Sequence, residues 1–100
     1  MFVLQKTKYF AEWLSSLRDS KTKAKILVRL TRMELGNLGD HKSIGNGVSE
    51  IRIDYGPGYR LYYTKNGNTI LILLVGGDKS SQQKDIERAK KILYEMENNI

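Results

Sequence analysis

The sequence contains no cysteine, and it has a single histidine, a single proline and a single tryptophan among its 100 residues. The absence of cysteine excludes disulfides and zinc–thiolate sites, and it favours a reducing compartment such as the cytoplasm. With one histidine, a metal site would need clustered carboxylates, and none occurs at ligand spacing. We therefore expect a cytoplasmic protein that uses neither a metal nor another cofactor.

Long apolar runs are also missing. The longest uninterrupted run, Ile70–Val75, is too short to cross a bilayer. The first ten residues, MFVLQKTKYF, hold only a four-residue apolar run, which is shorter than the apolar region of a signal peptide. We expect no membrane partner and no cleaved leader.

Positive charge exceeds negative charge, with 17 lysines and arginines against 11 acidic residues. A net charge of +6 favours an anionic partner, although such a charge also serves solubility alone. The excess is uneven: residues 1–47 carry nine cations and four acids, and residues 48–100 carry eight and seven. The N-terminal half therefore supplies most of the positive field.

The length predicts one domain spanning residues 1–100. Residues 1–5 suit a short strand, and Thr7 can cap a following helix whose apolar residues recur at helical spacing, namely Phe10, Trp13, Leu14 and Leu17. Asp19 or Ser20 caps a second helix over about 21–35, which Gly36 ends. These segments predict a helical hairpin packed on a sheet.

The second predicted helix carries two apolar stripes and a basic ridge. One stripe holds Ala24, Leu27, Val28, Thr31 and Leu35, and the other holds Ile26, Leu30 and Met33. Lys21, Lys25, Arg29 and Arg32 follow at three- and four-residue steps between them. A helix that is apolar on two sides is covered on both sides or keeps one for a partner, and the ridge is most simply a solvated face.

Residues 36–47 hold four glycines, and we predict a loop there. His41 and Lys42 lie in it. From Val48 the apolar pattern changes to period two and predicts strands over 48–54, 59–64 and 69–75, joined at Gly56-Pro57-Gly58 and Asn66-Gly67. Gly76-Gly77 is expected to end the third of these strands. The last helix is expected to begin near Ser80 or Ser81 and to bury Ile86, Ala89, Leu93 and Met96.

Three cations are expected to meet on the sheet. Arg52 and Arg60 fall on adjacent strands joined by a tight turn, and Lys79 follows the next strand. Two guanidiniums and an ammonium would hold a phosphodiester strongly. Tyr59 and Tyr63 have the parity of core residues, so Tyr62 is the better candidate for stacking on a base, with Tyr55 and Lys42 as further substrate contacts.

Such a site could cleave RNA without a metal, through attack of the 2′-hydroxyl on the adjacent phosphate. The pattern does not choose the proton acceptor. The possible groups are Glu50, Asp54, Asp78, Asp85 and His41. From the residues alone, phosphate binding ranks above catalysis.

The block EIRIDYGPGYRLYY, followed by ILILLVGGDKSSQQKDIERAKKI, resembles the toxins of the RelE/ParE superfamily, and within it the HigB-like addiction module killer proteins. The resemblance covers nearly the whole chain. It implies an α+β fold with an N-terminal strand, a helical hairpin, an antiparallel meander and a C-terminal helix. It also implies a cognate antitoxin, typically one with a helix-turn-helix DNA-binding domain.

The resemblance implies roles for some residues. Arg60 matches the strand arginine that contacts the scissile phosphate in RelE-like toxins, and Arg52 matches a basic residue of the preceding strand. Lys79 lies where a second phosphate-binding arginine often stands. A second basic position is reversed to Glu50, and the C-terminal tyrosine of some members has no counterpart here. The acid–base group is therefore Glu50, Asp78 or His41, unless the ribosome supplies it.

Two functions follow from the resemblance. The first is ribosome-dependent cleavage of mRNA, which arrests translation. The second is ParE-like inhibition of DNA gyrase by binding, in which the basic ridge of the second helix would carry the contact. An inactive toxin relic is a third reading.

Overall fold

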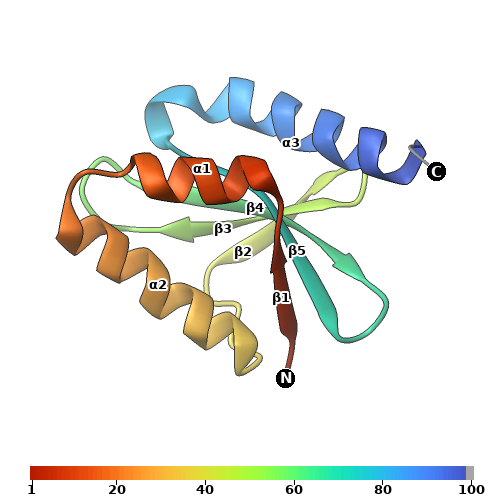
Figure 1. Cartoon of the computed structure of the whole chain (residues 1–100), viewed down its shortest axis with the longest axis horizontal. Coiled ribbons are helices and arrows are strands. Elements are labelled where there is room, and N and C mark those ends of the chain that lie inside the picture. Colours follow the sequence, from red (N-terminus) through yellow and green to blue (C-terminus); the bar gives the residue numbers. More distant parts are fainter. Residues whose placement is uncertain (99–100) are drawn as a thin grey trace.

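In a computed structural model, which describes residues 1–98, a first strand is followed by two helices, four further strands and a C-terminal helix (Figure 1). The elements in chain order are β1 (Val3–Lys6), α1 (Lys8–Ser16), α2 (Ser20–Glu34), β2 (His41–Gly45), β3 (Val48–Ile53), β4 (Tyr59–Asn66), β5 (Ile70–Asp78), a 3₁₀ turn η1 (Lys79–Ser81) and α3 (Gln82–Asn98).

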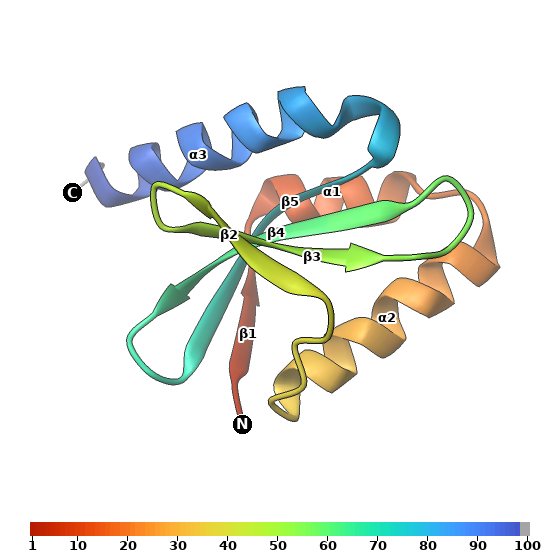
Figure 2. The ribbon, with the colours of Figure 1, turned by 180° about the vertical axis from the view of Figure 1, so that it is seen from behind.

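The strands form one mixed five-stranded sheet in the order β1-β5-β4-β3-β2. Strands β2 to β5 make an antiparallel meander, and β1 pairs in parallel with β5, with Val3 opposite Ile70. The α1–α2 hairpin packs on one face of the sheet and α3 on the other, as the two opposite views show (Figures 1 and 2). The predicted α+β class is confirmed, and so is the order of strand, helical hairpin, antiparallel meander and C-terminal helix, to which β2 adds a strand that was not predicted.

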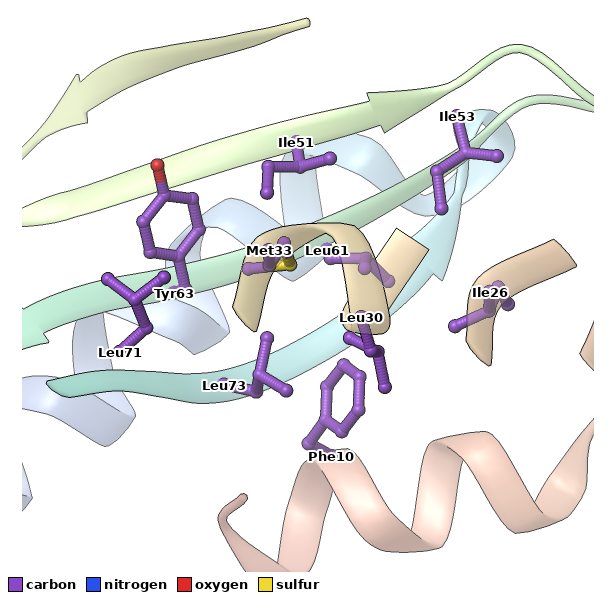
Figure 3. Packing of buried hydrophobic residues seen from close by; sticks show 10 residues of the cluster. All are labelled: Phe10, Ile26, Leu30, Met33, Ile51, Ile53, Leu61, Tyr63, Leu71 and Leu73. Carbon is purple, nitrogen blue, oxygen red and sulfur yellow. The ribbon is translucent and has the colours of Figure 1, made fainter. Parts of the chain in front are cut away.

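The larger core lies between the helical hairpin and the sheet (Figure 3). Phe10 of α1 and the inner stripe of α2, which consists of Ile26, Leu30 and Met33, point toward alternate residues of three strands. The strand residues are Ile51 and Ile53 of β3, Leu61 and Tyr63 of β4, and Leu71 and Leu73 of β5. Burying one such side chain contributes about 1.5–3 kcal/mol. The predicted core position of Tyr63 is confirmed, and Tyr59 is partly buried against the same cluster.

The smaller core lies under α3, where Ala89, Ile92 and Leu93 cover the opposite parity of β4 and β5. Tyr62 belongs to this core and is fully buried. The prediction that Tyr62 stacks on a base is therefore wrong, because α3 covers the sheet face that we expected to be open. Met96, predicted to be buried, is 41% exposed, and Ile92 takes the inner position.

The residues predicted to cap or end the first two helices do so in the structure. The Thr7 hydroxyl accepts a hydrogen bond from the Phe10 amide at 3.1 Å and donates one to the Leu74 carbonyl at 2.6 Å. Asp19 caps α2 by accepting from the Lys21 amide at 3.2 Å. Gly36, at φ +95°, follows the C-terminus of α2 in the left-handed conformation that glycine adopts readily. Both capping bonds are local, since each joins a side chain to an amide two or three residues further along the chain.

The glycine-rich loop prediction for residues 36–47 is wrong in its second half, which forms β2. Asn46 and Gly47 both have positive φ, 57° and 82°, and they make the two-residue connection between β2 and β3. Such a pair suits a type I′ turn, whose twist matches that of the flanking strands. At Asn66-Gly67 the hairpin is confirmed, but only Gly67 has positive φ, and the paired residues Asn66 and Ile70 enclose three residues.

The expectation that Gly76-Gly77 ends a strand is also wrong, since both glycines lie inside β5. Each is placed where another side chain fills the position of a Cβ: the Trp13 ring at Gly76 and the Asp85 carboxylate at Gly77. Their role is close approach of α1 and α3 to the sheet rather than termination. The C-terminal helix accordingly begins at Gln82, just after η1.

The two apolar stripes of α2 have different environments. Ile26, Leu30 and Met33 are buried in the larger core, whereas Leu27 and Val28 are 47% and 49% exposed. The outer stripe therefore lies open on the molecule.

Of residues 1–98, no helix combines the length and the apolar character that a bilayer crossing requires.

Candidate functional site

Arg52, Arg60 and Lys79 line one depression of about 340 Å³ at the end of the β3–β4 hairpin. Arg52 and Arg60 are direct cross-strand neighbours, as the alternation predicted. Lys79 is brought there by the Gly56-Pro57-Gly58 turn, because its amide donates to the Gly58 carbonyl at 2.9 Å. Gly58 itself has φ +83°, which favours glycine.

The Arg60 guanidinium is oriented by Glu50. Its Nε donates to Glu50 Oε2 at 3.1 Å, and the two side chains are 12% and 1% exposed. Lys42 Nζ lies 3.8 Å from the other carboxylate oxygen. Since Glu50 is enclosed between two cations, its placement suits holding Arg60 in position better than accepting a proton from a substrate.

Arg52 has a different environment, because its partner is exposed. Its Nε lies 3.2 Å from Asp40 Oδ2, and its Nη2 donates to Asp40 Oδ1 at 3.2 Å. The side chains are 43% and 60% exposed, so the pair contributes about 0–1 kcal/mol and can open to an incoming anion. Asp40 was not predicted from the sequence: only the pairing of β2 with β3 brings it to Arg52.

The remaining acid–base candidates are spread over the molecule. Asp78 accepts from the Ser80 amide at 2.9 Å and so caps η1. His41 is exposed and opposite Ile51 in the ladder, so strand alternation puts it on the α2 side of the sheet, away from Arg60. Asp54 is the one of the five candidates that lines the depression, next to Ile53.

The remaining predicted substrate contacts lie around the depression rather than in it. Lys42 is exposed on the edge strand and close to Glu50. Tyr55 is half-buried, with Lys25 Nζ 5.4 Å from its ring centroid, and it lines a groove beside α2. A tyrosine there could contact a bound chain that extends past the depression.

Two buried polar side chains, Tyr62 of β4 and Asp85 of α3, lie between α3 and the sheet. Burial raises the pKa of Tyr62 to about 12, and the nearby Asp85 and Glu50 carboxylates add to that effect. Burial also raises the pKa of Asp85, against the opposing effect of its hydrogen bond from the Ser81 hydroxyl at 2.5 Å. The Tyr62 hydroxyl has no hydrogen-bond partner within residues 1–98.

We predict that Tyr62→Phe changes the free energy of unfolding at pH 7 by less than about 1 kcal/mol, since no protein hydrogen bond is lost. The phenol with the raised pKa stays neutral in the folded state while it ionises in the unfolded chain near pH 10. Tyr62 therefore makes the stability fall between pH 10 and about 12, and the variant should show a shallower decline over that window. Urea denaturation at pH 7 measures the first effect, and a series from pH 9 to about 12 measures the second. An equal decline in parent and variant would contradict the assignment.

Within the described part of the chain, no three histidine, cysteine, aspartate or glutamate side chains come together in a way that could hold a metal ion. The charged groups that line the depression are the guanidiniums of Arg52 and Arg60, the ammonium of Lys79 and the carboxylates of Asp40 and Asp54.

Residues 12–96 of the sequence match the family described as phage derived protein Gp49-like (DUF891). The chain belongs to this family, which is associated with RelE-like toxins of toxin–antitoxin systems. It is also 46% identical over 93 residues to an uncharacterized protein of Haemophilus influenzae (strain Rd). That alignment covers 93% of this chain and 94% of the relative.

Proposed function

We propose that the protein is the toxin of a type II toxin–antitoxin module and acts as a ribosome-dependent, metal-independent mRNA endoribonuclease. The observation that carries the proposal is the convergence of Arg52, Arg60 and Lys79 on one depression. Family membership supports the toxin class, and the HigB-like resemblance supports the target.

The depression has the groups that stabilise a phosphorane-like transition state. Glu50 engages Arg60 through Nε, which leaves the two terminal nitrogens of the guanidinium to face a phosphate. Three cations and two carboxylates, Asp40 and Asp54, line the site, so its net charge is positive. Removing one such donor from a preorganised site lowers rates by about 10²–10³.

Asp54 is the carboxylate best placed to accept the proton of the attacking 2′-hydroxyl. It is exposed, it lines the depression, and no ion pair engages it within residues 1–98. Asp40, in contrast, is held by Arg52 at 3.2 Å. The 2′ oxygen then bonds to phosphorus, the bond from phosphorus to the 5′ oxygen breaks, the 5′ oxygen takes a proton from solvent, and a 2′,3′-cyclic phosphate remains.

Partners follow from this function. The message is presented by the ribosome, and a cognate antitoxin, with a helix-turn-helix DNA-binding domain, neutralises the toxin. The positive field of residues 1–47 assists encounter with either the ribosome or an acidic antitoxin segment.

We expect Arg60→Lys and Lys79→Ala each to reduce cleavage of a translated message by about 10²-fold. Both variants spare the fold: lysine keeps a cation opposite the buried Glu50, and Lys79 is exposed. Primer extension on mRNA in a cell-free translation reaction measures the cleavage. The matched control is Lys84→Ala, which removes an exposed lysine of α3 outside the depression and should cut at the parent rate.

Equal cleavage by the parent and both site variants would remove these cations from the mechanism. If the parent leaves translated messages intact but inhibits DNA supercoiling by gyrase, the ParE-like function replaces the nuclease.

A further inference from the structure

A second depression lies between α2 and the end of β3, and its volume of about 680 Å³ is twice that of the Arg60 site. Its positive wall is the basic ridge of α2, formed by Lys21, Lys25, Arg29 and Arg32. We call this depression the α2 groove. From Lys21 to Arg32 it extends along roughly 16 Å of helix, which is about three turns.

The α2 groove combines this charge with an apolar surface. Ala24 and Val28 come from the outer stripe of α2, and Ile53 and Tyr55 come from β3 and the turn that follows it. Val28 is 49% exposed, so a large part of its side chain is available to a ligand.

Charge in the α2 groove is largely uncompensated. Asp54 is the one carboxylate among its lining residues, against four cations. None of these cations has an acidic partner within 4.0 Å in the described range 1–98. Arg29 donates to the Leu38 carbonyl at 3.4 Å, and Lys25 lies over the Tyr55 ring, so both are held near the surface of the groove.

We propose that the α2 groove docks an acidic amphipathic segment of a protein partner, whose apolar side chains lie on Val28 and Tyr55 and whose carboxylates pair with the basic ridge. Exposed aliphatic side chains favour a peptide over RNA, because nucleic-acid surfaces are dominated by polar and cationic groups. An amphipathic helix binds such a groove by placing apolar side chains, spaced three or four residues apart, against its apolar surface. The inference rests on the proposed function for the identity of the partner, an antitoxin, but not for its chemistry.

The position of the groove gives the docking a consequence. Ile53 and Asp54 line both the α2 groove and the Arg60 depression. A segment seated along α2 therefore reaches the edge of the catalytic depression and Asp54, and it can obstruct an RNA strand without contacting Arg60.

Selection from a phage-displayed library of random peptides, each about 15 residues long, tests the docking without assuming a partner. Enriched peptides should be acidic, with apolar residues at i, i+3 or i+4, and i+7. By fluorescence anisotropy, Lys25→Glu/Arg32→Glu should weaken their binding by at least about tenfold, and Val28→Ser by about threefold. The control Lys84→Glu/Lys91→Glu makes the same charge change on α3 and should alter binding by less than about twofold.

Several outcomes would overturn the proposal. The first is enrichment of peptides without acidic character, and the second is equal binding of the peptides to the Lys25→Glu/Arg32→Glu variant and to the parent. The third is that this variant loses its affinity for a labelled single-stranded RNA and keeps its affinity for the peptides. Lys79→Ala separates the two proposals: it should reduce cleavage by about 10²-fold and leave peptide binding unchanged. Circular dichroism of each variant excludes misfolding, and the Val28→Ser result stands if the double variant fails to fold.

Discussion

Replacing Glu50 with alanine should lower the free energy of unfolding by about 3–5 kcal/mol, more than any other single carboxylate in the sheet. The carboxylate is 1% exposed and bound by Arg60 at 3.1 Å, and its loss leaves a nearly buried guanidinium without a partner. Urea denaturation at pH 7 measures the change. Glu50→Gln keeps an acceptor for Arg60 Nε and should lose less stability than Glu50→Ala.

Two further variants make this prediction specific. Asp40→Ala breaks the exposed pair with Arg52 and should cost less than about 1 kcal/mol. Glu50→Leu/Arg60→Met removes both buried charges and should recover much of the stability while it abolishes cleavage. If Glu50→Ala is no more destabilising than Asp40→Ala, the Glu50–Arg60 pair does not organise the site.

Replacing Gly77 with alanine should destabilise the fold by about 2–3 kcal/mol, because the added methyl group would occupy the position of the Asp85 carboxylate. Asp85 is buried, so its side chain cannot simply turn into solvent. The displacement separates η1 and the first turn of α3 from β5, and this segment carries Lys79. We therefore expect the variant to lose cleavage as well as stability.

A double-mutant cycle with Asp85→Ala tests the cause of that loss. In the Asp85→Ala background, the effect of Gly77→Ala on the free energy of unfolding should fall below about 1 kcal/mol, because the overlapping carboxylate is gone. Additive effects would show that the overlap with Asp85 is not the reason for the glycine.

The helices and most strands could be predicted because their signals are local. Helical spacing from Phe10 to Leu17, and the caps at Thr7 and Asp19, specify α1 and α2 without reference to the rest of the chain. The pairing of Arg52 with Arg60 followed from alternation across a short turn. These features could be predicted because each depends on residues that are close together in the sequence.

What could not be predicted depends on contacts between distant segments. Nothing near Gly76 in the sequence indicates the Trp13 ring, and nothing near Tyr62 indicates that α3 covers it. The role of Glu50 beside Arg60 likewise needed coordinates, because alternation gives the face but not the hydrogen bond. For β2 a local signal existed in Asn46-Gly47, the same dipeptide that indicated the later hairpin, but the surrounding glycines favoured a loop.

The parallel pairing of β1 with β5 constrains the order in which a nascent chain can mature. Val3 aligns with Ile70, and the Thr7 hydroxyl donates to the Leu74 carbonyl, so β1 cannot take its place in the sheet until β5 has been synthesised. Contacts this far apart in sequence slow folding, because a long loop must close before they form. A translating ribosome must therefore release β5, which ends at Asp78, before the sheet, and with it the cationic depression, can be completed.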